Sequence, residues 1–168
     1  MSRALGAAAG FLLDRLLGEP PLAAHPVALF GRVMSAAERR MWGDDRASGV
    51  LFTAVGVVPA FGVGLTLRRL LGAGPSTAVA AMMSIAGRML NRSAIDVSSA
   101  LGNGDLGAAR ALLPTLVGRD ASQLDHSEIA RATIESVADN AVDAVIAPLW
   151  WGAIAGAPGI LAHRAINT

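Results

Sequence analysis

Three windows of this sequence contain no charged residue, and they limit the possible folds more than any other feature. They are Ala47–Leu67 with 21 residues, Leu70–Gly87 with 18 and Ala144–Ala162 with 19. An α-helix needs about 20 apolar residues to cross the hydrocarbon core of a bilayer. The first window is long enough. The other two are borderline and contain proline, so we expect kinked, tilted or re-entrant helices there.

The composition points to the same class of protein. Of the 168 residues, 53% are hydrophobic and 16% are charged, and the mean hydropathy is +0.49. Soluble domains carry about 25% charged residues, so this chain has more apolar surface than a core of its size can bury. No segment shows the alternation of a strand. We therefore predict an all-α, polytopic membrane protein in which residues 1–168 form one domain.

The residue types exclude several chemistries. There is no cysteine, which rules out disulfides, zinc-thiolate sites and cysteine nucleophiles. All fourteen basic residues are arginine, so neither a Schiff-base lysine nor a P-loop lysine is present. The net charge is +1 and the arginines are scattered, which argues against a nucleic-acid partner. Any bound phosphate would depend on arginine, backbone amides or a metal ion.

A polar region, residues 88–143, lies between the second and third windows, and its arginines favour the cytoplasmic side. Its predicted elements are helices over Arg88–Leu101 and Asp105–Leu113, a loop over Val117–Leu124 and a helix from Asp125 to about Val145. Asp125 and Glu128 form the D-x-x-E pattern of a capping box. Another helix is expected over Pro26–Trp42. We read the N-terminus as an amphipathic or partly inserted helix rather than a signal peptide.

An acidic stripe runs along the last of these helices. Glu135, Asp139 and Asp143 stand at i, i+4 and i+8, on one face. Like charges at this spacing repel by roughly 0.2–0.5 kcal/mol per pair, and desolvation beside the third apolar window adds to the cost. A bound cation would compensate, and Mg²⁺ takes one or two carboxylates together with substrate phosphates. The alternative is a solvated helix face.

Two further segments are candidates for binding. Gly118–Arg119–Asp120 combines a backbone-freeing glycine, an arginine fork and a carboxylate just before a helix, so it could hold an anion. The alternative is an ordinary loop with a local ion pair. Near the N-terminus, Asp14 precedes a His25–Pro26 pair. A histidine before proline is more often a turn residue than a catalyst.

Three sets of motifs carry a family resemblance. They are Leu13-Asp14…Gly18-Glu19-Pro20…His25-Pro26-Val27…Gly31-Arg32, then Gly104-Asp105-Leu106…Val117-Gly118-Arg119-Asp120-Ala121-Ser122, and then Ala132-Thr133…Glu135-Ser136-Val137-Ala138-Asp139-Asn140…Asp143…Ala147-Pro148-Leu149. Together they resemble the CobD/CbiB family, the adenosylcobinamide-phosphate synthases. This chain departs from the pattern with Asp139 in place of glutamate, Ala121 in place of threonine and Ala144 in place of glycine. Proteins of the family are considerably longer, so the chain corresponds to their N-terminal half.

The resemblance implies a multi-pass enzyme of the bacterial or archaeal inner membrane. The implied reaction is ATP-dependent amide formation that attaches aminopropanol, or its phosphate, to adenosylcobyric acid and gives adenosylcobinamide or its phosphate. The implied cofactors are ATP and Mg²⁺. The implied partners are a corrinoid substrate, the lipid bilayer, and a second copy or other membrane proteins of cobalamin synthesis.

The resemblance also gives the candidate residues their roles. The catalytic candidates are Glu135, Asp139, Asn140 and Asp143, of which the three carboxylates are the Mg²⁺ candidates. The substrate-binding candidates are Asp14, His25, Arg119, Asp120 and Ser122. Broken helices and carboxylates near a membrane are also found in ion pathways. A membrane transporter, a non-catalytic membrane partner and a soluble helical interaction domain therefore remain alternatives.

Overall fold

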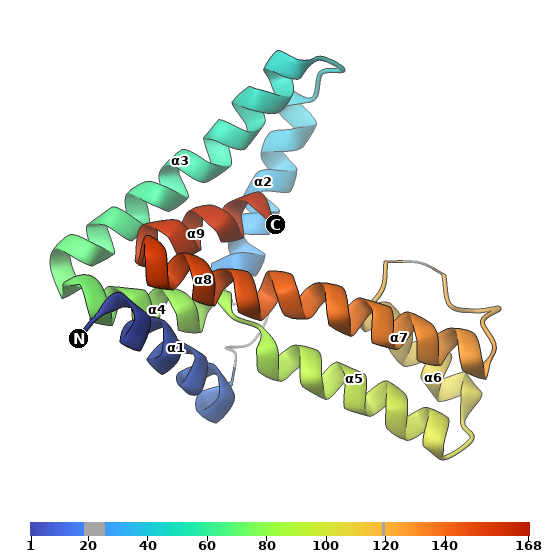
Figure 1. The fold of residues 1–168 in the computed structure, drawn as a ribbon. Helices are drawn as coiled ribbons and strands as arrows, with labels where there is room; N and C mark the ends of the chain where they lie inside the picture. The colour runs from blue at the N-terminus through green and yellow to red at the C-terminus, as the bar shows by residue number, and fades with distance from the viewer. Residues whose placement is uncertain (19–25, 119) are drawn as a thin grey trace.

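A computed structural model describes residues 1–18, 26–118 and 120–168, and every regular element within them is a helix (Figure 1). The α-helices are α1 (Arg3–Leu17), α2 (Pro26–Met41), α3 (Arg46–Leu71), α4 (Ala73–Ser84), α5 (Gly87–Gly102), α6 (Leu106–Leu112), α7 (His126–Ala141), α8 (Ala147–Ile154) and α9 (Ala157–Ile166). A short 3₁₀ turn, η1 (Leu113–Thr115), follows α6, and a π-helical segment, η2 (Val142–Ile146), joins α7 to α8. The all-α prediction is confirmed for this part of the chain.

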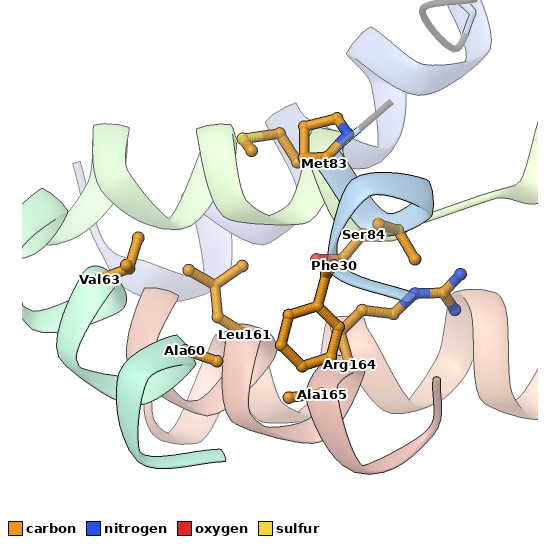
Figure 2. Close-up of a pocket in the computed structure, with 10 residues that line it drawn as sticks. Phe30, Ala60, Val63, Met83, Ser84, Leu161, Arg164 and Ala165 are labelled. Carbon is orange, nitrogen blue, oxygen red and sulfur yellow. The ribbon is translucent and has the colours of Figure 1, made fainter. Parts of the chain in front are cut away.

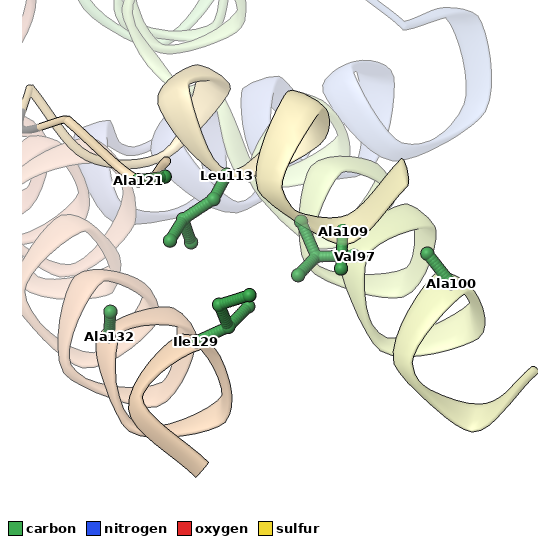
Figure 3. Close-up of a cluster of buried hydrophobic side chains, with 7 residues drawn as sticks. All are labelled: Val97, Ala100, Ala109, Leu113, Ala121, Ile129 and Ala132. Carbon is green, nitrogen blue, oxygen red and sulfur yellow. The ribbon is translucent and has the colours of Figure 1, made fainter. Parts of the chain in front are cut away.

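The helices form two packed groups. The body contains α1, α3, α4, α8 and α9 around the buried side chains of Ala80, Ala81, Ile85, Ala157 and Ile160. The arm contains α5, α6 and α7 around a second buried cluster, shown in Figure 3, that is centred on Val97, Leu113 and Ile129. One continuous rod of α7, η2 and α8 runs from the arm into the body (Figure 1).

The body is held together by very close helix contacts at glycines. A Cβ atom added to Gly10 of α1 would lie 2.5 Å from the carbonyl oxygen of Ala78 and 2.5 Å from the Cβ atom of Ala81, both on α4. A Cβ at Gly64 of α3 would lie 2.5 Å from the Cα atom of Pro158 on α9. Small residues that let backbones approach in this way are typical of helix packing in membranes.

Only the first uncharged window forms a long helix. Within the 26-residue α3, the most apolar stretch of 18 residues has a mean hydropathy of 2.1, and 11% of that stretch is buried. Within the described residues it is the one helix long and apolar enough to cross a membrane. By itself a single such helix is weak support for a membrane protein, and several crossings are not confirmed.

The other two windows are broken. The second is divided by Gly72, with φ of +79°, and leaves the 12-residue α4. The third is divided at Gly156, with φ of +73°, into helices of 8 and 10 residues. The expected kinks are present, but a single crossing helix over Ala144–Ala162 is not formed, since glycine at positive φ ends α8.

The predicted helix starts in the polar region agree with the structure. The Asp125 carboxylate accepts the Glu128 amide at 2.8 Å, and the Glu128 carboxylate accepts the Asp125 amide at 2.8 Å, which completes the capping box. The Asp105 carboxylate likewise accepts the amide of Ala108 at 2.8 Å and starts α6. Pro26 opens α2 as expected.

The glycine contacts can be tested by adding one methyl group. Gly10→Ala should lower the free energy of unfolding by about 1–3 kcal/mol, because the new Cβ has no room against α4. Gly62→Ala in α3 is the matched control, since nothing lies within 4 Å of its added Cβ. The control should be neutral or stabilised by up to about 1 kcal/mol. Denaturant unfolding in detergent measures both, and equal effects would contradict the packing described here.

Membrane integration through α3 can be tested by extraction. The unmodified chain should stay in the membrane pellet after washing with alkaline carbonate. Replacing the exposed Val55 and Val58 by arginine should release it, because each arginine near the centre of a crossing helix costs about 2.5–3.5 kcal/mol. Val50→Arg, near the start of α3, should be tolerated because its charge can reach the interface. Release of the unmodified chain would contradict a membrane role for α3.

Candidate functional site

A pocket with four polar side chains in its lining lies against the exposed face of α7, and we call it the α7 pocket. It has a volume of about 300 Å³ and is lined by Val117, Gly118, Ala132, Glu135, Ser136, Asp139 and Asn140. The structure thus brings the predicted anion-binding loop at Gly118 against two of the three acidic residues of the stripe. Asn140, the remaining catalytic candidate on α7, lines the same pocket.

Side-chain hydrogen bonds hold this loop on α7. The Ser136 hydroxyl donates to the carbonyl oxygen of Leu116 at 2.6 Å. The Asn140 amide nitrogen donates to the Ser136 carbonyl oxygen at 2.8 Å and to the Ser136 hydroxyl oxygen at 3.1 Å. Below the pocket, Ala132 and Ile129 of α7 pack on Leu113 and Ala121 in the core of the arm (Figure 3). The pocket therefore rests on a packed support rather than on a free loop.

The acidic stripe is only partly preserved. Glu135 and Asp139 are exposed on the pocket wall, and the Glu135 carboxylate lies 3.9 Å from Nε of Arg131. Asp143 does not line the pocket. Among the residues that the structure describes, no three His, Cys, Asp or Glu side chains gather closely enough to hold a metal ion.

Asp143 lies in the π-helical segment η2, where the hydrogen-bonding pattern widens to i→i+5. Among the described residues, the three carboxylates of the predicted magnesium site do not gather closely enough to hold a metal ion. Glu135 and Asp139 remain together, and two carboxylates completed by phosphate oxygens still fit the usual coordination of Mg²⁺.

Pro148 explains the change in helix type. It has no amide hydrogen to donate to the carbonyl group of Ala144 one turn earlier. That carbonyl instead accepts the amide of Ala86, at 3.2 Å, from the link between α4 and α5. Segments of π-helix often occur at functional sites, and here the segment joins the body to the arm.

Asp120 and Ser122 form hydrogen bonds with each other. The Asp120 carboxylate accepts the Ser122 amide at 2.9 Å and the Ser122 hydroxyl at 3.0 Å. These hydrogen bonds hold the pKa of the Asp120 carboxyl below its usual value. Both residues shape the turn after Gly118 and do not line the pocket. The candidates Arg119 and His25 lie outside the described residues.

Asp14 lies elsewhere, in the body. It is 1% exposed, and its Oδ2 atom accepts the backbone amide of Arg88 at 3.3 Å, at the start of α5. The Arg88 guanidinium in turn donates to the carbonyl oxygen of Leu16 at 3.2 Å. In the structure Asp14 ties α1 to α5, and it does not share a pocket with the α7 carboxylates.

His163 on α9 is a residue that the sequence patterns did not single out. It lies within the electrostatic range of the Asp143 carboxylate. Its Nδ1 atom is buried and has no hydrogen-bond partner among the described residues. A single histidine forms no spacing pattern in the sequence. Its proximity to Asp143 follows only from the packing of α9 against α8.

Comparisons with known proteins give a consistent result. Residues 7–168 match the family model described as CobD/Cbib protein. The chain is 42% identical to the cobalamin biosynthesis protein CobD of Mycobacterium tuberculosis over 171 residues, which cover 99% of this chain and 54% of that protein. It is 39% identical to proteins of the same name from Pelobacter propionicus, covering 96% of this chain and 53% of the relative, and Stutzerimonas stutzeri, covering 100% and 57%. The chain spans about half the length of these relatives, and no solved structure matches it significantly.

Proposed function

The chain belongs to the CobD/CbiB family, and on that premise we propose that it forms the N-terminal half of a membrane enzyme that makes an amide bond at the expense of ATP. The proposed acyl substrate is adenosylcobyric acid, and the proposed amine is aminopropanol or its phosphate. The observation that carries the proposal is the α7 pocket, where the Gly118 loop meets Glu135, Asp139 and Asn140.

The pocket suits the phosphoryl transfer that would activate a carboxylate. When bound, Mg²⁺ would neutralise the negative charge that develops on the phosphate groups of ATP. Glu135 and Asp139 would hold it, because both are exposed on one wall and leave room for phosphate oxygens. Arg119 follows Gly118 in the sequence, and we propose that it supplies the positive charge that a chain without lysine can offer.

The other candidates are assigned supporting roles. Asn140 is positioned by its hydrogen bonds to Ser136 and would orient the substrate at the pocket wall. Asp120 and Ser122 would fix the turn that presents the loop. Asp143 lies beyond the pocket within the electrostatic range of His163, and this pair would accept the proton that the amine loses before it attacks.

Asp14 and His25 complete the proposed assignment. Asp14 would act indirectly by holding the start of α5, where it accepts the amide of Arg88. His25 precedes α2, and we keep it as a substrate-binding candidate on the basis of the family motif alone.

The position of α7 favours an enzyme over a transporter. An ion pathway needs carboxylates within the membrane-crossing part of a protein. Glu135 and Asp139 lie on a helix that packs on α5, α6 and η2, in the arm that extends away from α3 (Figure 1). The exposed apolar side chains are concentrated on the body, including Val58 and Leu70 of α3 and Trp150 of α8. We propose that the body sits in the cell membrane in several passes and that the arm projects into the cytoplasm.

The carboxylates can be tested in the full-length protein by measuring the amide product with ATP and Mg²⁺. Glu135→Gln and Asp139→Asn should lower turnover by about 100-fold or more and raise the Mg²⁺ concentration needed for half-maximal rate. Asp143→Asn should also remove most activity, but without the shift in Mg²⁺ dependence. Asp139→Glu restores the residue typical of the family and should keep activity.

Asp96→Asn is the matched control, since it removes an exposed carboxylate from the same arm without touching the pocket. Each variant should remain in the membrane fraction. Near-normal turnover of Glu135→Gln and Asp139→Asn at limiting Mg²⁺ would show that the acidic stripe is only a solvated helix face.

A further inference from the structure

Hydrogen bonds fix the orientation of the Asn140 side-chain amide in the α7 pocket. Its Nδ2 atom donates to the Ser136 carbonyl oxygen at 2.8 Å and to the Ser136 hydroxyl oxygen at 3.1 Å. That hydroxyl is able to accept, because its own hydrogen is donated to the carbonyl oxygen of Leu116 at 2.6 Å. Both Nδ2 hydrogens of Asn140 are thus used within the protein.

The same groups disfavour the opposite orientation of the amide. Turning it over would place Oδ1 against the Ser136 carbonyl oxygen and against a hydroxyl whose hydrogen is already donated elsewhere. Oxygen acceptors would then face one another with no hydrogen between them, which is costly. Asn140 lines the pocket, so the group it offers to a ligand is Oδ1, a hydrogen-bond acceptor. The two hydrogen bonds from Nδ2 also polarise the amide and strengthen Oδ1 as an acceptor.

The polar wall of the α7 pocket therefore consists of oxygen acceptors. Glu135 and Asp139 contribute carboxylates, and Asn140 contributes Oδ1. The Ser136 hydroxyl adds no donor, since its hydrogen is bonded to Leu116. Such a wall binds cations and groups that carry N–H or O–H hydrogens. A phosphate or a carboxylate consists of acceptors, so it approaches this wall only with a cation between them.

The cavity in the body has a different lining. It lies where α2, α3, α4 and α9 meet, and its volume is about 240 Å³. Its wall is mostly apolar and includes Phe30, Val63 and Leu161, with no carboxylate among the described residues that line it (Figure 2). A small amine would lose its hydrogen bonds to water there without replacing them. The α7 pocket is therefore the better place for such a group.

We propose that Asn140 determines specificity for the amine substrate, by accepting one N–H hydrogen at Oδ1, and that Ser136 is the positioning residue that keeps Oδ1 turned toward the pocket. Of the groups that react in the proposed function, only the amine carries N–H hydrogens. Asn140 is also the pocket residue nearest in sequence to Asp143, about one helical turn away, to which the proton of the amine is assigned.

The hydrogen bond would orient the nucleophile without taking its proton. An N–H held at Oδ1 fixes the direction of the nitrogen lone pair, which must face the activated acyl carbon. The inference rests on the proposed function and deepens it by naming the atom that recognises the amine. It concerns only how the amine is held, and it leaves the Mg²⁺ ion to Glu135 and Asp139.

The test measures the amine directly in the full-length protein. The probes are 1-aminopropan-2-ol and its O-phosphate, whose dissociation constants are obtained by saturation-transfer difference NMR in nanodiscs without ATP. Asn140→Ala should raise the dissociation constant of the tighter probe about tenfold, as expected for the loss of one hydrogen bond. Ser136→Ala should raise it about threefold, because the Ser136 carbonyl oxygen still holds one hydrogen of the amide. Asn91→Ala, at an exposed position on α5 outside the pocket, is the control and should change nothing.

Steady-state kinetics separate this role from a general structural one. In Asn140→Ala the KM for the amine should rise about tenfold, whereas the KM for ATP and the Mg²⁺ concentration for half-maximal rate should stay unchanged. The unchanged KM for ATP also shows that the pocket of the variant is folded.

Two results would overturn the inference and leave the proposed function standing. One is an unchanged affinity of Asn140→Ala for both probes. The other is a higher Mg²⁺ requirement with unchanged amine binding, which would assign Oδ1 to the cation. Failure of the proposed function is recognised separately, because the unmodified protein would then form no amide product. The NMR measurement still decides in that case whether Asn140 holds the amine.

Discussion

The carbonyl group of Ala144 is the point on which the relation between body and arm depends. Pro148 deprives it of its partner within the helix, and the Ala86 amide takes that place at 3.2 Å. The contact ties the link between α4 and α5 to the rod of α7, η2 and α8. Near this contact, the Asp14 carboxylate accepts the backbone amide of Arg88 at the start of α5. The arm, which carries the α7 pocket, is thus fixed to the body where an α-helix gives way to a π-helical turn.

The helices of the body and those of the arm pack in different ways. In the body, glycines bring helix backbones into direct contact, so large apolar side chains such as Leu12, Val58 and Trp150 point outward. In a protein surrounded by lipid this arrangement has little cost, because the chains outside are as apolar as the side chains. In the arm, larger side chains such as Leu113 and Ile129 fill a core, and charged residues lie on the surface. That division fits a membrane body that carries a water-exposed arm.

The chemical groups are distributed along one rod. Glu135 and Asp139 line the α7 pocket. Asp143 lies beyond the pocket, within the electrostatic range of His163. A reaction that activates an acid and then joins it to an amine needs distinct places for the phosphate and for the amine. The separation of the carboxylates by η2 agrees with such a division.

The sequence by itself determined what depends on neighbouring residues. The capping box of Asp125 and Glu128 fixed the start of α7, the absence of charge in Ala47–Leu67 predicted α3, and the linked motifs identified the family. These signals act within a few turns of helix, so they can be read without a fold. Only the tertiary structure decided that Asp14 is buried at the start of α5 and that the α7 pocket contains Glu135 and Asp139 but not Asp143. Both depend on contacts between residues far apart in the chain, and no local spacing pattern encodes them.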